Sequence, residues 1–289
     1  YNDFLITRDL DLNFLDKLKW RAGSLFKINY FGIYNSFDTK EFLIPIIDLT
    51  LEKKARVIYK NLKKKLLNKS DILKIKINNV HVGDLIYDTY LKRYKKKTIE
   101  LNKDFYIFFK NFIKLFCYWE NYITLNSIKS VVGHHAVYSY SIPLRIAINK
   151  DIPTYAINCM EVFRLNKQRY IKNLDHLDYK KKFNQLSKSI QKKFLNEAKL
   201  KIYNRIKGKV SSNEGMDYVT RSSLQNNNDN ERVLPKNNKI KILITTHDFF
   251  DAVHAFGDLI FPDFYEWILF MAKKSKNSKY EWYIKTHPS

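Results

Sequence analysis

Histidine side chains gather after stretches of sequence that have strand character. Four of the seven histidines do so: His134 and His135 follow residues 130–133, His247 follows 240–246, and His287 follows 280–285. An imidazole titrates near neutral pH, so it can take a proton from a hydroxyl group or interact with an anionic phosphate. Ligands of parallel sheets bind beyond the carboxyl ends of the strands, so the pattern predicts one ligand site lined by these histidines.

Two strand–helix–strand units are predicted to position these residues. The first has strands at 130–133 and 153–158 around a helix at 137–148, and the second has strands at 240–246 and 280–285 around a helix at 262–272. So short a connection places the two strands of each unit in parallel within one sheet. The sequence therefore predicts an α/β fold.

The rest of the chain is predicted to be mainly helical. Apolar residues recur at helical spacing in five segments, at 10–31, 49–68, 83–91, 104–125 and 171–210. Two short strands, 75–77 and 80–82, precede the third of these helices. Asp84 stands where a residue that caps this helix is expected.

A polar stretch divides the chain into two predicted domains. Residues 1–210 form an N-terminal domain with extra helices, 211–238 a linker, and 239–289 the start of a C-terminal domain. So short a C-terminal segment cannot bury a full doubly wound core. The chain opens on Tyr1 and stops just after a predicted strand, so we expect it to be an incomplete piece of a two-domain protein.

Composition favours a helical, globular protein over an all-β one. Hydrophobic residues make up 45% of the chain, with only 7 Gly and 6 Pro. The net charge is +23, yet only ten of the 52 basic residues are arginine, the side chain that forks onto phosphates and base edges. Three explanations stay open: the codon bias of an AT-rich genome, a basic face toward an anionic membrane or phosphorylated acceptor, and nucleic-acid binding, which this arginine-poor composition favours least.

The sequence gives no sign of a cysteine-based metal site, a transmembrane helix or a signal peptide. Cys117 and Cys159 have no close Cys or His at metal-ligand spacing, which predicts reduced core thiols. The most apolar segment, 105–123, is interrupted by charged residues, and the chain does not open with a signal peptide. We therefore expect a cytoplasmic protein, with any membrane contact peripheral to the inner face of the plasma membrane.

Several segments resemble bacterial capsule and surface-carbohydrate glycosyltransferases of the GT-B type. The segments are Val82-Gly83-Asp84-Leu85-Ile86-Tyr87-Asp88-Thr89-Tyr90-Leu91, Thr246-His247-Asp248-Phe249-Phe250-Asp251, Phe256-Gly257-Asp258 and Tyr283-Ile284-Lys285-Thr286-His287-Pro288. The His-Pro element is also similar to that of capsule Kdo transferases and bacterial polysialyltransferases, where it contacts the donor nucleotide. The resemblance covers about residues 75–289 and implies two Rossmann-like domains that face a cleft, the second of them truncated here.

The resemblance also implies an activity: transfer of a sugar from a nucleotide-sugar donor to a glycan or lipid-linked glycan acceptor of the capsule or lipopolysaccharide type. This transfer needs a base for the acceptor hydroxyl and a positive environment for the departing phosphate. The catalytic candidates are Asp84, His134 and His135. Candidates for donor binding are His247, Asp248, Lys285, His287 and Pro288, and those for acceptor binding are Asp88, Arg145 and Arg164.

No cofactor, metal or nucleic acid is expected for this activity. Enzymes of the GT-B type typically need no metal, and Asp9-Leu10-Asp11, which matches the metal-binding pattern of another glycosyltransferase type, precedes a helix instead of following a strand. Other roles stay open for several candidates. Gly83-Asp84 is consistent with a tight turn and a helix cap, while Arg145 and Arg164 are consistent with solvated surface positions. His81 and His176 are expected at the surface or on an edge strand.

Two other functions remain open at this point. One is a CDP-polyol-dependent polyol-phosphate transferase of the teichoic-acid type, which uses a similar two-domain frame. The other is a nonenzymatic basic protein that binds polysaccharide or RNA. The second alternative predicts that the three histidine-bearing loops lie far apart in the structure.

Overall fold

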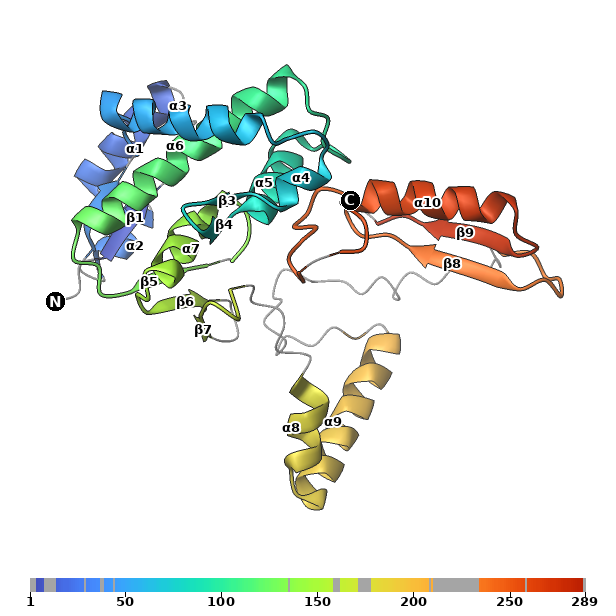
Figure 1. Ribbon diagram of the computed structural model, residues 1–289. Coiled ribbons are helices and arrows are strands. Elements are labelled where there is room, and N and C mark those ends of the chain that lie inside the picture. The colour runs from blue at the N-terminus through green and yellow to red at the C-terminus, as the bar shows by residue number, and fades with distance from the viewer. Residues whose placement is uncertain are drawn as a thin grey trace.

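The computed structural model describes residues 4–7, 14–28, 30–36, 39–43, 45–134, 136–157, 162–170, 178–207, 209, 234–257 and 259–287. The predictions for His135, Cys159, His176, Pro288 and most of the linker at 211–238 fall outside these residues. Within the described residues the chain combines helices with four small sheets, which confirms the predicted α/β class (Figure 1). The N-terminal sheet pairs β1 (Phe4–Thr7) in parallel with β2 (Thr39–Leu43), next to α1 (Phe14–Phe26) and α2 (Tyr30–Asn35).

The long helix α6 (Lys103–Leu125) forms the centre of the main core, where the sequence predicts a buried helix at 104–125. It begins at Asn102, whose side chain accepts a hydrogen bond from the Phe105 amide at 3.1 Å and so satisfies one unpaired donor of the first turn. Cys117 is buried on this helix, as predicted. Five phenylalanines on it are also buried: Phe105, Phe108, Phe109, Phe112 and Phe116.

Helix α3 (Leu49–Lys63) packs along α6 and is held there by ion pairs at the margin of the contact. Glu52 accepts from Lys114 at 2.6 Å and lies 3.3 Å from Lys110. Buried Ala55 lets the two helices approach closely. The lysines that interrupt the apolar pattern of α6 are thus the partners of its neighbour.

A hairpin leads into α5 (Gly83–Tyr94), the helix around which the candidate site is built. The hairpin consists of β3 (Lys76–Ile77) and β4 (Val80–His81), as predicted, and α4 (Ser70–Leu73) precedes it. A Cβ atom at Gly83 would lie 2.4 Å from the Ile72 carbonyl oxygen, so glycine is required by close approach of backbone. The prediction that Asp84 caps α5 is wrong: Val82 occupies that position, and Asp84 lies within the first turn.

The first predicted strand–helix–strand unit is confirmed. Strands β5 (Val131–Gly133) and β6 (Thr154–Ile157) are parallel, and α7 (Ile142–Asn149) connects them after the short 3-10 helix η1 (Ser139–Ser141). A third strand, β7 (Val162–Leu165), pairs antiparallel with β6 and was not predicted. It is a four-residue edge strand, which is too short to give a clear periodic pattern.

The second predicted unit is also confirmed. Strands β8 (Lys241–Thr245) and β9 (Glu281–Lys285) are parallel, and α10 (Phe264–Lys276) lies along the two-stranded sheet (Figure 1). Asp263 caps α10 by accepting from the Glu266 amide at 2.8 Å. The strands are in flush register, with Thr245 opposite Lys285. Their carboxyl ends therefore deliver two loops side by side.

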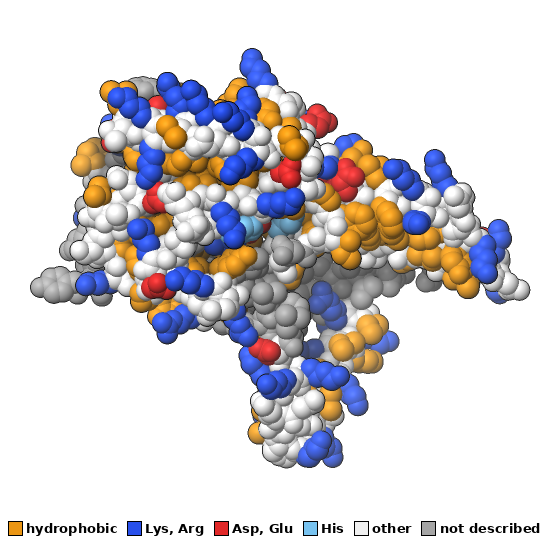
Figure 2. Space-filling model, viewed as in Figure 1, with side chains coloured by type: hydrophobic (Ala, Val, Ile, Leu, Met, Phe, Trp, Pro, Cys, Tyr) orange, Lys and Arg blue, Asp and Glu red, His pale blue; other side chains and the backbone are white. Residues whose placement is uncertain are grey.

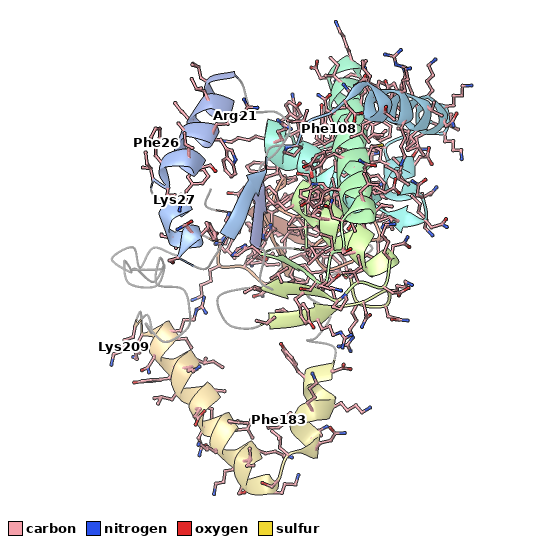
Figure 3. All side chains as sticks on the ribbon, turned by 90° about the vertical axis from the view of Figure 1, so that its left-hand side faces the viewer. Arg21, Phe26, Lys27, Phe108, Phe183 and Lys209 are labelled. Carbon is pink, nitrogen blue, oxygen red and sulfur yellow. The ribbon has the colours of Figure 1, made fainter. Side chains whose placement is uncertain are left out.

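Helices α8 (Tyr179–Gln185) and α9 (Lys188–Ile206) stand apart from the rest of the molecule (Figures 1 and 3). The sequence predicts helix throughout 171–210, but the helix is interrupted at Leu186, which adopts an extended backbone. Ser187 then begins α9 by accepting a hydrogen bond from the Ile190 amide. Across the described ranges, no helix is both long enough and apolar enough to cross a bilayer.

Candidate active site

Two histidines meet at the carboxyl ends of β8 and β9. The ring centroids of His247 and His287 lie 5.6 Å apart, and both side chains are exposed. The flush register explains this proximity, because each histidine stands two residues beyond paired strand ends. Lys285, also exposed, ends β9, and its carbonyl accepts from the Thr246 amide at 3.0 Å. Three cationic or titratable side chains thus gather at one sheet edge.

Asp248 orders the loop that carries His247. Its carboxylate accepts from the Phe250 amide at 3.3 Å, and its carbonyl oxygen lies 3.2 Å from Nδ1 of His247. A carbonyl can only accept, so Nδ1 donates in this contact, and a neutral ring has its acceptor at Nε2. We therefore assign Asp248 to holding the loop rather than to direct contact with a ligand.

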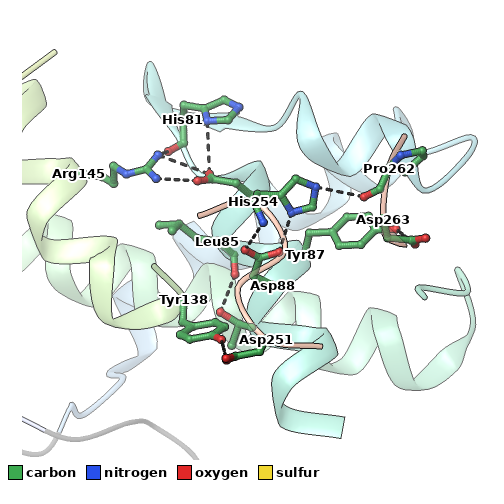
Figure 4. A network of polar contacts seen from close by, with 12 residues as sticks. His81, Leu85, Tyr87, Asp88, Tyr138, Arg145, Asp251, His254, Pro262 and Asp263 are labelled. Atoms are coloured by element: carbon green, nitrogen blue, oxygen red, sulfur yellow. Dashed lines mark hydrogen bonds and ion pairs between the residues drawn. The ribbon is translucent and has the colours of Figure 1, made fainter. Parts of the chain in front are cut away.

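A polar stripe runs along α5 and joins it to two other parts of the chain. Asp84, Asp88 and Lys92 recur at every fourth position, which places them on one face of the helix. Each makes a charged contact with a residue distant in sequence. Asp84 contacts α7, and Asp88 contacts the loop of residues 246–263 that follows β8 (Figure 4). Lys92 contacts the same loop.

Asp84 forms a buried ion pair with Arg145 of α7. Oδ2 of Asp84 accepts from the Arg145 guanidinium at 2.6 Å, and the same guanidinium donates to the His81 carbonyl at 3.2 Å and lies over the Tyr170 ring at 4.2 Å. Burial opposes ionisation of Asp84, but the charge and hydrogen bonds of Arg145 and His81 outweigh it and hold the pKa of this carboxyl well below its usual range. Arg145 is only 4% exposed, so the alternative that it occupies a solvated helix surface is wrong.

Asp88 and His254 form a second buried pair, with exposed fractions of 2% and 4%. Nδ1 of His254 lies 2.6 Å from Oδ1 of Asp88, the His254 amide donates to Oδ2 at 3.0 Å, and Nε2 lies 3.1 Å from the Pro262 carbonyl oxygen. Nε2 faces a carbonyl oxygen, which can only accept, so Nε2 carries a proton; when Asp88 is ionised, Nδ1 donates to it and the ring is an imidazolium. Burial would lower the pKa of His254, but the hydrogen bond and charge of Asp88 raise it above its ordinary value.

The third contact of the stripe ties the loop after β5 to the loop after β8. Asp251 accepts from Lys92 at 2.7 Å and from the Tyr138 hydroxyl at 2.6 Å. Burial and the neighbouring Asp251 carboxylate raise the pKa of Tyr138, so its phenol keeps the proton that it donates. Tyr138 and Ala252 both have left-handed backbone, with φ of 57° and 46°. Such strain persists only where surrounding contacts enforce it, and here it marks the meeting point of the two loops.

A fourth set of polar contacts fixes the far end of the same loop. Asp263 is fully buried and accepts from the Tyr87 and Thr98 hydroxyls, each at 2.5 Å. Lys69 lies 3.6 Å from Asp263 and donates to Glu266 at 2.5 Å. The residue that caps α10 is therefore also bonded to α5, so the unit of β8 and β9 is held against the helical body at both ends of this loop.

The structure brings some of the predicted site residues together and separates others. His134 is exposed directly after β5, four residues before Tyr138, so its loop meets the loop of His247 through the contact between Tyr138 and Asp251. Arg164 is exposed on β7, an edge strand of the sheet that also contains β5, so it lies on a different sheet from the one that His247 and His287 follow. His81, expected at the surface or on an edge strand, lies on β4 of the two-stranded hairpin and is half-buried, with Nε2 2.7 Å from the Leu73 carbonyl oxygen and Nδ1 3.4 Å from Asp84.

Residues that join the two parts of the site were missed in the sequence. They are Tyr138, His254, Asp263 and the pair Lys92 and Asp251. One signal was present: acidic or basic residues at every fourth position of a helix that is otherwise apolar. His254 gave no such signal, because it stands in a loop and its burial depends on the docking of that loop.

No protein-family model, curated protein or solved structure matches this chain significantly. The chemistry of the site therefore has to be argued from its geometry. Figure 2 shows histidine surface among lysine and arginine side chains at the junction between the helical body and the unit of β8 and β9. Among the described residues, no group of three or more His, Cys, Asp or Glu side chains is arranged to hold a metal ion.

Proposed function

We propose that this chain is part of a GT-B-type glycosyltransferase that moves a sugar from a nucleotide-sugar donor to a surface-glycan acceptor. The observation that carries the proposal is the adjacency of His247 and His287, with Lys285 beside them, beyond the carboxyl ends of two parallel strands. This is the place where parallel sheets bind nucleotides. A complete enzyme of this type has two Rossmann-like domains, to which the two strand–helix–strand units would contribute.

The exposed cluster suits the leaving group of this reaction. Departure of a nucleoside phosphate leaves negative charge on phosphate oxygens, and positive charge or N–H donors aimed at those oxygens lower the barrier. Lys285 is cationic at neutral pH, and His247 and His287 can each donate an N–H. We assign these three side chains to the donor, together with Pro288 as the following residue of the resembling motif.

On the acceptor side, His134 is the better placed of the described base candidates. It is exposed after β5, in the loop bonded to that of His247, and an imidazole takes up a proton near neutral pH. Asp84 is less suited, because its lowered pKa makes it a weak base and Arg145 occupies its oxygens. We therefore assign Asp84 to positioning, and His134 with its neighbour His135 to removal of the acceptor proton.

The proposed acceptor residues divide in the same way. Asp88 and Arg145 are buried and paired with His254 and Asp84, so we assign them to holding the loops rather than to contact with the acceptor. Arg164 is exposed and keeps its proposed role in binding an anionic acceptor. The acceptor would be a glycan or lipid-linked glycan, since the donor side already accounts for the nucleotide.

The test is a thermal-shift screen of the chain with CMP, UDP and GDP. A ligand that binds only the folded state stabilises it by about 2.7 kcal/mol at 100 times its Kd, so the nucleotide that raises the melting temperature identifies the donor class. His247→Ala and His287→Ala should abolish the shift, whereas His134→Ala should keep it. Absence of a shift with all three nucleotides would refute the donor site.

Product analysis of the full-length enzyme separates sugar transfer from polyol-phosphate transfer. Sugar transfer leaves a glycosidic bond and a nucleoside mono- or diphosphate. Transfer of a polyol phosphate leaves a phosphodiester and always releases CMP. Formation of a phosphodiester would identify the protein as a polyol-phosphate transferase instead. Nucleotide binding without any transfer would favour the nonenzymatic binding protein.

A further inference from the structure

The hairpin of α8 and α9 has side chains that the rest of the molecule does not cover. None of its residues is buried, including the whole length of α9. Its own contacts are local: Gln191 donates to the Leu186 carbonyl at 2.8 Å, and Arg169 pairs with Asp178 at the base at 2.8 Å. A helix of this length without a buried face is only marginally stable in water, so its exposed side chains call for a partner.

Apolar side chains form a continuous stripe along α9. Five residues share every fourth position and therefore one side of the helix: Ile190, Phe194, Ala198, Ile202 and Ile206. Phe194 is 45% exposed and Ile202 is 61% exposed. Large exposed hydrophobic residues in such a row mark an interaction surface rather than a scatter of single residues.

The same hairpin is strongly basic. Residues 178–207 contain nine lysines and one arginine against two acidic residues, a net charge of +8. Lys193 is three positions after Ile190 and Lys199 three positions before Ile202, so both flank the stripe, and Lys192 stands farther round α9. The hairpin thus combines an apolar stripe with positive charge on all sides of it.

We propose that the hairpin of α8 and α9 docks on the surface of a membrane rich in anionic lipids. The ammonium groups of the lysines beside the stripe would contact the phosphates, and the apolar side chains of the stripe would enter the boundary between headgroups and acyl chains. A second copy of this hairpin is disfavoured by repulsion between two charges of +8. RNA is disfavoured because the stripe carries a single aromatic ring, that of Phe194, for bases to stack on, and the hairpin has a single arginine. The proposal does not depend on the proposed transferase activity.

Vesicle flotation of the whole chain tests this docking. The chain should float with vesicles of phosphatidylcholine and phosphatidylglycerol and stay behind with phosphatidylcholine alone. The triple variant Lys192→Gln, Lys193→Gln, Lys199→Gln should bind the anionic vesicles about 100-fold more weakly, since each lysine near such a surface contributes about fivefold. Its matched control replaces three exposed lysines of the region around α3, Lys53, Lys60 and Lys64, and should bind within about fivefold of the original chain.

The apolar stripe has its own variant. Phe194→Ser with Ile202→Ser should weaken binding to anionic vesicles at least tenfold, with an unchanged circular-dichroism spectrum, because both side chains are exposed in the free chain. Equal binding to neutral vesicles, or equal losses in the two lysine variants, would overturn the proposal. A chain dimer that the serine variant dissociates, or tight binding of single-stranded RNA with no vesicle binding, would assign the surface to those partners instead.

Discussion

Asp88 and His254 are 166 positions apart in the chain, yet Oδ1 and Nδ1 of these residues lie 2.6 Å from each other in a buried contact. The His254 amide and the Pro262 carbonyl complete the pairing. This contact fastens the loop that follows β8 onto α5. It therefore sets the position of His247 relative to the helical body.

Replacement of His254 by glutamine should destabilise the chain strongly. The substitution leaves the Asp88 carboxylate buried without a cation, and loss of one member of such a pair costs about 3–5 kcal/mol. Urea unfolding followed by circular dichroism measures this loss. Asp151→Asn, which removes an exposed pair with Lys167, is the matched control and should cost less than about 1 kcal/mol. Equal losses in both variants would show that the buried pair contributes nothing particular.

The same pair predicts how stability depends on pH. The pKa of His254 is raised in the folded chain, so its contribution is fully present below about pH 6.5 and declines as the pH rises through the folded pKa. Burial also raises the pKa of Asp88, although His254 counteracts this, and the effect on stability has the same sign. We expect the free energy of unfolding to fall by up to about 1.4 kcal/mol per pH unit for one proton. His254→Gln should flatten this decline, and an unchanged slope would contradict the assignment.

Gly83→Ala should destabilise the chain although glycine is normally a poor helix residue. The added Cβ would lie 2.4 Å from the carbonyl oxygens of Ile72 and Leu73, which are backbone atoms that cannot rotate away. Overpacking of this kind costs about 1–3 kcal/mol, measurable by thermal unfolding. Gly133→Ala is the comparison, because its Cβ would meet only the flexible Leu144 side chain at 2.9 Å and should cost less. A larger loss for the second variant would reverse this ranking.

Tyr138→Phe should break the contact between the loop after β5 and the loop after β8 without creating a cavity in the core. It removes the hydroxyl that donates to Asp251 and keeps the ring, so stability should fall by about 2 kcal/mol, as expected for a hydrogen bond to a charged group. If the loops form one site, turnover should fall about tenfold while the thermal shift with the nucleotide is kept. Tyr140→Phe, at a position 60% exposed, should change neither quantity. Loss of nucleotide binding in Tyr138→Phe would place this side chain in the donor site instead.

The histidines are expected to differ in their kinetic effects in the full-length enzyme. His287→Ala should raise the KM for the donor strongly, because it removes a contact to the nucleotide. His135→Ala should mainly lower kcat, since a missing base slows proton removal by about 100-fold or more without loosening the donor. Steady-state kinetics with varied donor distinguishes the two. Normal activity in both variants would remove these assignments.

The elements that local pattern controls could be predicted from the sequence, and the contacts between them could not. The helix at 104–125 and both strand–helix–strand units are visible in apolar periodicity, and so is the place of His247 and His287 after their strands. Strand β7 and the break at Leu186 depend on a few residues each and leave little periodic signal.

The sequence predictions failed mainly for buried polar residues, because their burial depends on tertiary contacts. Arg145 stands on a helix, where a charged residue is ordinarily expected to be exposed. Its burial is possible only because Asp84 of α5 pairs with it. His254 is likewise buried only because a loop 166 residues away from Asp88 docks on α5. A charge whose partner is remote in sequence cannot be recognised as buried from its neighbours alone.

The flush pairing of β8 with β9 makes the spacing of the two imidazole rings a property of backbone alignment. If either strand shifted by a single residue, the histidine ring that follows it would move along the strand by about 3.3 Å. The side chains of the shifted strand would also point to the opposite side of the sheet. Extra residues in the turn between α10 and β9 would leave the rings together, whereas one extra residue inside either strand would part them. The distance between His247 and His287 is thus maintained by the ladder of main-chain hydrogen bonds behind them.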